Sequence, residues 1–151
     1  TAAVAASGVE VEVLNNGDGT VTRSYRGSPL RGFALFMSED FQVSQEMVNG
    51  VRLNTWYLPD DVDTSQAVLQ VVADAVTVFD EHFGPYPYAE LDAVVIPDAR
   101  FPADMVTGVE YPTLVVVRHG GAGEPEFVTA HEVAHQWWYG IVGNDVLQEP
   151  W

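Results

Sequence analysis

The sequence contains two histidines four residues apart, with a glutamate directly after the first: His131-Glu132-Val133-Ala134-His135. Side chains at positions i and i+4 of a helix project from the same face, so the two imidazoles can bind one metal ion together. The glutamate is turned around the helix, where its carboxylate can reach a water on the metal but not the metal itself. These residue types at this spacing are typical of a catalytic zinc site. In such a site zinc lowers the pKa of the water and the carboxylate carries its proton to the leaving amine.

The residues around the motif predict that it lies on a helix over 126–139. Pro125 is tolerated in a first helical turn, and Gly140 is typical of the residue that follows a helix. Phe127 and Trp138 share the face of the histidines, which predicts that this face is buried in a cleft. The local pattern therefore supports the metal-site interpretation beyond the five-residue match itself.

A catalytic zinc site also needs a third protein ligand, whose spacing separates the classes of zinc peptidase. The metzincin pattern requires glycine at position 138 and histidine at position 141, whereas the chain has Trp138 and Ile141. The remaining common arrangement takes a glutamate from the next helix, about 18 residues after the second histidine. That position is near 154, beyond Trp151, and the acidic residues Asp145 and Glu149 lie short of it. We therefore expect the sequence to end before its own metal site is complete.

The composition is that of a globular chain with a strongly acidic surface. The 151 residues include 22 acidic and 6 basic side chains, which gives a formal net charge of −16. This charge steers cationic ligands such as peptide amino termini, or it serves solubility alone; nucleic acid and anionic membranes are disfavoured partners because both require Lys and Arg. No apolar run approaches the roughly 20 residues of a membrane span. The absence of cysteine excludes disulfides and leaves the compartment open, and residues 1–9 lack the basic leader of a signal peptide.

Hydrophobic periodicity predicts an α+β fold in which β structure comes first. Apolar side chains at helical spacing predict a helix over 64–83, which Asp63 or Thr64 can cap and which Gly84 ends. Alternating or β-branched runs predict strands, the first of which alternates as a half-buried strand does. The predicted strands are 9–14, 21–25, 32–37, 41–48, 51–58, 92–97 and 113–118.

The composition changes at Pro59, and we place a domain boundary near residue 58. Residues 1–58 read as a β domain without a catalytic constellation, and residues 59–151 read as a mixed α/β segment that contains all the candidate site residues. The small, apolar start of the chain reads as the interior of a longer protein.

Three segments of the second part occur in a recognisable combination. They are 83–88 (Phe-Gly-Pro-Tyr-Pro-Tyr), 107–112 (Thr-Gly-Val-Glu-Tyr-Pro) and 131–151, which begins His-Glu-Val-Ala-His-Gln-Trp-Trp-Tyr-Gly. Together they resemble the aminopeptidase N family of zinc metallopeptidases, gluzincins with a thermolysin-like catalytic domain. The second segment resembles the exopeptidase motif of that family, usually Gly-x-Met-Glu-Asn or Gly-x-Met-Glu-Tyr-Pro. The resemblance implies that 1–58 is the end of an amino-terminal β domain and 59–151 the first part of the catalytic domain.

The resemblance implies a role for each matching residue. His131 and His135 would bind Zn²⁺, and Glu132 would act as the general base. The partner would be a peptide substrate with a free amino terminus, whose α-amino group Glu110 would hold as a carboxylate–ammonium pair. The substrate-binding positions implied in this way are Gly108, Val109 and Glu110.

Two positions depart from the family motif, which puts the selectivity for substrate side chains in doubt. Val109 stands where the family usually has methionine, and Thr107 where it usually has the first glycine. The strand after Pro112 is expected to be a sheet edge to which the substrate backbone adds.

The leading hypothesis is a zinc-dependent aminopeptidase, of which these 151 residues are a fragment with little or no activity of their own. A second reading is a related gluzincin with endopeptidase or epoxide-hydrolase-like activity. A third is a non-catalytic scaffold that serves as a protein-binding module. Such scaffolds tend to lose the ligands or the base, and this chain retains His131, Glu132 and His135.

Overall fold

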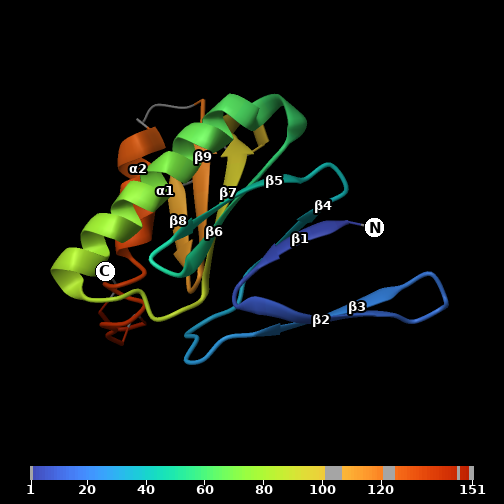
Figure 1. Ribbon diagram of the computed structural model, residues 1–151, viewed down its shortest axis with the longest axis horizontal. Coiled ribbons are helices and arrows are strands. Elements are labelled where there is room, and N and C mark those ends of the chain that lie inside the picture. The colour runs from blue at the N-terminus through green and yellow to red at the C-terminus, as the bar shows by residue number, and fades with distance from the viewer. Residues whose placement is uncertain (1, 101–106, 121–124, 146, 150–151) are drawn as a thin grey trace.

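A five-stranded sheet forms the centre of the fold (Figure 1). The computed structural model describes residues 2–100, 107–120, 125–145 and 147–149. The sheet has the order β5-β6-β7-β9-β8, in which β6, β7 and β9 are parallel and β5 and β8 pair antiparallel at the edges. Its strands are β5 (Gln42–Val48), β6 (Val51–Tyr57), β7 (Glu90–Pro97), β8 (Gly108–Tyr111) and β9 (Leu114–His119). Sheets combined with helices confirm the predicted α+β class.

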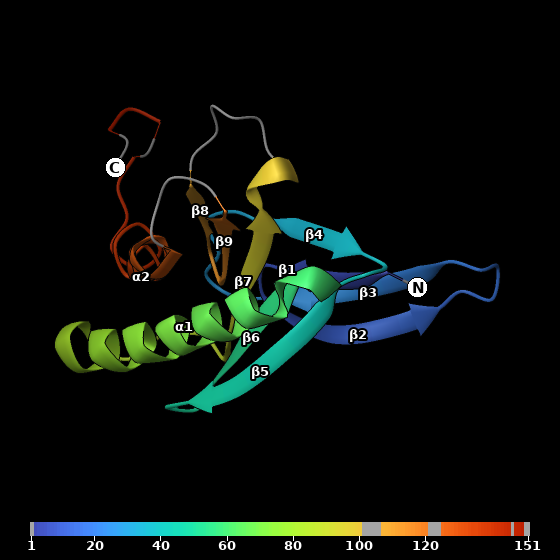
Figure 2. The ribbon, with the colours of Figure 1, turned by 90° about the horizontal axis from the view of Figure 1, so that it is seen from above.

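One face of the sheet is covered by a long helix, α1 (Val62–Phe83), as the two ribbon views show (Figures 1 and 2). Its apolar stripe, which includes Val68 and Val72, packs in one cluster with Leu53 of β6 and Leu91 of β7. Complete burial of each such side chain stabilises the fold by about 1.5–3 kcal/mol. The predicted first helix is confirmed, because a strong apolar period requires this packing.

The start of α1 differs from the prediction, while its end agrees with it. The N-cap residue is Asp61, and its side chain makes no capping hydrogen bond, so neither Asp63 nor Thr64 has the expected role. Asp61 Oδ1 instead lies 3.0 Å from Nε2 of His119 at the end of β9. At the other end, Gly84 has a φ of 97° and its N–H closes the last turn, as the glycine predicted. A contact between distant parts of the chain thus replaces the local cap.

The opposite face of the sheet is covered by the first part of the chain. There β1 (Ala3–Ala6) pairs with β4 (Leu35–Ser38), and β2 (Val9–Asn15) pairs with β3 (Val21–Arg26). A second cluster of buried residues joins this part to the sheet: Ala5, Ala34, Val94, Leu114 and Val116. The central sheet is therefore buried on both of its faces.

Several strand predictions need correction. The strand predicted over 9–14 is confirmed as β2, but the half-burial expected from its alternation is wrong, because Val11 and Val13 are 51% and 50% exposed. The strand expected over 32–37 begins only at Leu35. Two strands, β1 and β8, are only four residues long and are not among the predicted strands; they become strands by pairing with β4 and β9.

The central sheet continues across the boundary expected at residue 58. Strands β5 and β6 precede that residue, and β6 pairs with β7 from Arg52 opposite Glu90 to Trp56 opposite Val94. A division at residue 58 therefore separates strands that share one hydrogen-bonded sheet. Within the described ranges, neither helix has the length and apolar character that crossing a membrane requires.

Asp92 is buried in β7 and is expected to make folding depend on pH. Its Oδ1 accepts a hydrogen bond from Asn54 Nδ2 at 2.6 Å, and burial raises its pKa from 3.8 to about 7. Between these values the folded state binds more protons than the unfolded state. The contribution of Asp92 to stability is therefore fully present below about pH 4 and is lost as the pH rises through about 7.

We expect the free energy of unfolding to fall by up to about 4 kcal/mol between about pH 4 and pH 7. The urea concentration at the midpoint of unfolding should fall with it. The Asp92→Asn variant should show a smaller fall, because the amide does not titrate, whereas Glu132, whose pKa is also raised to about 7, still does. Urea denaturation of the wild type and of the variant, monitored by circular dichroism at several pH values, measures the fall in each protein. A fall of equal size in the two proteins would contradict the assignment to Asp92.

Candidate active site

The metal motif lies on the second helix, α2 (Pro125–Ala134), and on the turns that follow it. The N–H of His135 donates to the carbonyl of His131 at 3.3 Å, so both histidines remain on one turn. The helix is shorter than the range 126–139 expected for it. At Gln136 and Trp137 the backbone N–H groups bond to carbonyls three residues back, and Gly140 bonds five residues back, to His135. Tyr139, rather than a glycine, has the positive φ of 105°.

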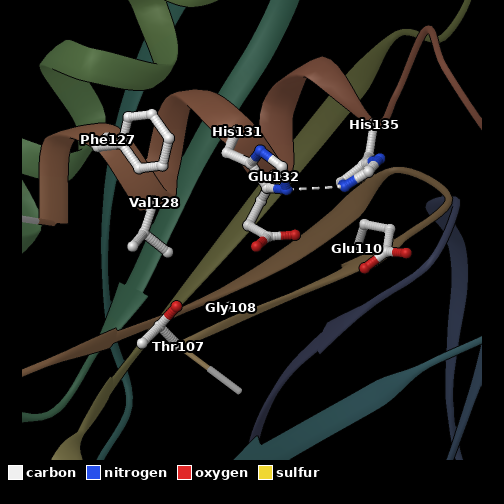
Figure 3. Close-up of a pocket in the computed structure, with 8 residues that line it drawn as sticks. All are labelled: Thr107, Gly108, Glu110, Phe127, Val128, His131, Glu132 and His135. Atoms are coloured by element: carbon white, nitrogen blue, oxygen red, sulfur yellow. Dashed lines mark hydrogen bonds between the residues drawn. The ribbon is translucent and has the colours of Figure 1, made fainter. Parts of the chain in front are cut away.

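A pocket of about 350 Å³ lies between α2 and β8, within the size range of small-ligand sites (Figure 3). The helix contributes the two histidines and Glu132, while the strand contributes Glu110, and these side chains point toward one another. The lining residues are Thr107, Gly108, Glu110, Phe127, Val128, His131, Glu132 and His135. The structure therefore brings the sequence motif and the resemblance-based glutamate into one site.

The two histidines have a geometry that fits a zinc ion. Their Nε2 atoms lie 3.1 Å apart, close to the roughly 3.3 Å that separates two nitrogens on a tetrahedral ion with Zn–N bonds of about 2.0–2.1 Å. His135 Nδ1 lies 3.1 Å from the carbonyl oxygen of Trp138. Since a carbonyl only accepts, Nδ1 carries the proton and Nε2 keeps the lone pair that a metal ligand needs. His131 is the more exposed of the two and stacks on the ring of Phe127 at 6.1 Å.

Glu132 is buried between the helix and the first residue of β8. It is 5% exposed, and its Oε2 has no hydrogen-bond partner among the described residues, an arrangement that fits a ligand in the pocket. A Cβ on Gly108 would clash with Glu132 Oε1, so the glycine leaves the space that the carboxylate occupies. Burial and, to a lesser extent, the charge of Glu110 raise the pKa of Glu132 to about 7, while His135 opposes the rise.

Glu110 brings a second carboxylate to the same place. One ligand atom each from Glu110, Glu132 and His135 lies within 4.8 Å of the others. Two carboxylates this close repel each other in a partly buried pocket, and a bound cation relieves the repulsion. The site is therefore suited to positively charged ligands, either a metal ion or an ammonium group.

Not every residue expected at the site reaches it. Val109 packs against the second core cluster on the other face of the sheet, since alternate residues of a strand point to opposite faces. Phe127 is 73% exposed, so the expected burial of its side chain is wrong, while Trp138 is partly buried against the core. The strand after Pro112 is not the sheet edge: β9 lies between β7 and β8, and β8 is the edge.

Gln136 is a residue of this region that the sequence patterns do not single out. It is 1% exposed, and its side chain bonds to the backbone of the β8–β9 turn. The signal in the sequence is a polar residue between the apolar Val133 and Trp137, just after the end of α2.

Comparison with known proteins finds relatives that are named as aminopeptidases. The chain is 30% identical to aminopeptidase M1 of Arabidopsis thaliana over 139 residues, which is 85% of this chain and 15% of that protein. It is 29% identical to human endoplasmic reticulum aminopeptidase 1 over 77% of the chain and 13% of that protein. Mouse aminopeptidase N matches at 29% identity over 72% of the chain and 12% of that protein.

The chain thus spans less than a sixth of each of these relatives. No model of a protein family matches the sequence. The three relatives are nevertheless all named aminopeptidases, and each matches most of this chain. The chain belongs to the aminopeptidase N family.

Proposed function

We propose that the protein containing this chain is a zinc-dependent aminopeptidase that removes residues from the amino terminus of peptides. One observation carries the proposal: the histidine pair of a zinc site and the glutamate of an exopeptidase motif line the same pocket. The names of the relatives support peptidase activity at the level of the family.

The residues of the pocket divide the chemistry among them. His131 and His135 are the ligands for zinc, which when bound supplies Lewis-acid activation of the scissile carbonyl and of a water molecule. Glu132, next to this position, accepts a proton from the water and returns it to the leaving amine. Glu110 holds the α-ammonium group of the substrate by a charge-assisted hydrogen bond.

The closeness of these groups explains why cleavage would occur at the amino terminus. Ligand atoms of Glu110, Glu132 and His135 lie within 4.8 Å of one another. An ammonium group held by Glu110 would therefore lie close to His135, and so close to the proposed metal position, which favours cleavage of the first peptide bond. Among the described strands β8, which carries Glu110, lies at the edge of the sheet, where the substrate backbone could pair with it.

We expect removal of either histidine to abolish zinc binding by the full-length protein. Removing a residue that only hydrogen-bonds to a metal ligand already weakens metal affinity about 10–100-fold. Removing a ligand itself, as in His131→Ala or His135→Ala, should therefore weaken zinc affinity by more than this. Metal analysis after dialysis against a zinc buffer measures the effect. His82→Ala is the matched control, because His82 is exposed near the end of α1 and bonds to Val78 of its own helix. Retention of zinc by both site variants would remove the histidines from this role.

These 151 residues alone are expected to bind zinc weakly and to hydrolyse peptides little or not at all. A catalytic zinc site takes three protein ligands, and we assign two histidines here. Turnover of a peptide by the isolated chain with zinc would show that the third ligand lies within it.

The test of the proposal compares a peptide with a free amino terminus and the same peptide acetylated, using the zinc-loaded, full-length protein. We expect cleavage of the free peptide, loss of that cleavage after chelation, and its return with zinc. Equal cleavage of both peptides would favour an endopeptidase. The absence of cleavage by zinc-loaded protein would favour a non-catalytic scaffold.

A further inference from the structure

Gln136 directly follows the second metal-binding histidine and is buried, with 1% of its surface exposed. A buried amide must satisfy both its donor and its acceptor to avoid a cost in stability. Its Nε2 donates to the carbonyl of Tyr111 at 3.0 Å, and its Oε1 accepts from the N–H of Thr113 at 2.8 Å. The hydroxyl of Tyr86 lies 3.5 Å from the same oxygen. One side chain from the metal-binding segment thus bonds to both sides of a distant turn.

That turn connects β8 to β9, and Glu110 is the second-last residue of β8, separated from the turn only by Tyr111. Thr113 has a φ of 63°, an uncommon backbone conformation for a β-branched residue, so contacts with the rest of the fold must maintain it. Its carbonyl accepts from the N–H of Asp92 at 2.9 Å, and its hydroxyl accepts from the N–H of Gly8 at 2.6 Å. These two bonds attach the turn to β7 and to the first part of the chain. The bonds to Gln136 attach it to the segment that carries the histidines.

The bonds of Gln136 to the β8–β9 turn hold Glu110 at a fixed distance from His135. Gln136 is one residue from His135, and Tyr111 is one residue from Glu110, so a short covalent and hydrogen-bonded path joins the metal ligand to the carboxylate. We propose that Gln136 is a positioning residue that sets Glu110 relative to the metal-binding histidines and thereby controls recognition of the substrate amino group. This inference rests on the proposed aminopeptidase function.

A role in core packing alone predicts a different outcome from a role in positioning. A side chain that only stabilises the fold changes the fraction of folded, active protein, which lowers the apparent kcat and leaves KM unchanged. A side chain that places Glu110 changes the affinity for an ammonium group. Loss of a hydrogen bond to a charged group costs about 1.5–3 kcal/mol, which corresponds to roughly 10–100-fold in affinity.

The test uses the full-length, zinc-loaded protein and the variant Gln136→Met, which keeps the length of the side chain and removes its hydrogen bonds. We expect KM for a peptide with a free amino terminus to rise about tenfold or more while kcat changes little and zinc content is unchanged. Calorimetry with leucinol, an amine without a scissile bond, should show a matching loss of affinity. Gln70→Met is the control, since Gln70 is exposed on α1 and donates to Asp74 of its own helix.

Gln136→Asn provides a second variant if the methionine variant does not fold. Its amide is polar but one methylene shorter, so it cannot keep both bonds to the turn without moving β8, and we expect the same loss of leucinol affinity. Unchanged leucinol affinity and KM in a folded variant would overturn the inference, as would a fall in zinc content with KM unchanged. A wild-type protein that binds leucinol no better than N-acetylleucinol would instead overturn the proposed function, which separates the two failures.

Discussion

Replacing Glu132 with glutamine is expected to lower kcat of the full-length, zinc-loaded protein by about 10²–10⁴-fold, the usual contribution of a general base. The amide keeps the size of the side chain but cannot accept the proton of the attacking water. Glu132 is 5% exposed, lines the pocket beside both histidines and has an oxygen without a partner among the described residues. Zinc content should not change, because the carboxylate is not assigned as a ligand. Steady-state kinetics and metal analysis on the same preparation measure the two quantities.

Glu126→Gln is the matched control for this variant. Glu126 lies on the same helix, is exposed, and does not line the pocket that contains the histidines. We expect its kcat and zinc content to equal those of the wild type. A Glu132→Gln protein that keeps wild-type kcat would require another base.

Replacing Glu110 with glutamine is expected to lower kcat/KM for peptides with a free amino terminus by about a hundredfold, mainly through KM. Truncating one partner of a buried, hydrogen-bonded charge pair costs about 2–5 kcal/mol. Glu110 is half-buried, and the nearby carboxylate of Glu132 strengthens the attraction for an ammonium group. Kinetics with free and acetylated versions of one peptide measure the change.

The acetylated peptide provides the internal reference for this variant. It has no ammonium group, so the Glu110→Gln change should leave its kcat/KM unchanged or raise it slightly, because the amide removes a negative charge. The Glu126→Gln protein should keep the wild-type preference. Equal losses for both peptides would show that Glu110 supports the fold or the metal site and does not recognise the amino group.

The sequence predicts the parts of this fold that depend on a regular local pattern. The apolar period of α1 is continuous over several turns, so its packing face and its end at Gly84 follow from local sequence. The start of α1 does not follow, because Asp61 pairs with His119, which is adjacent only in the folded chain. Strand β8 is similar: its four residues are too few to predict a strand, and they become one by pairing with β9.

The candidate site is predictable to a comparable degree. The spacing of His131 and His135 suffices to place both imidazoles on one turn, and the structure has their Nε2 atoms 3.1 Å apart. No local pattern relates Glu110 to the histidines, because their proximity depends on how β8 packs against α2. The role of Gln136 is harder to predict from the sequence, because it depends on the backbone atoms to which its amide is hydrogen-bonded in the folded chain.

The central claim is that one pocket holds both a zinc ion and the amino group of the substrate. A crystal structure of the full-length protein with zinc and leucinol, with anomalous data at the zinc edge, tests it most directly. We predict an anomalous peak about 2.0–2.1 Å from Nε2 of both His131 and His135. The leucinol ammonium should lie about 2.7–2.9 Å from a carboxylate oxygen of Glu110. Zinc bound elsewhere, or an ammonium group away from Glu110, would contradict the account.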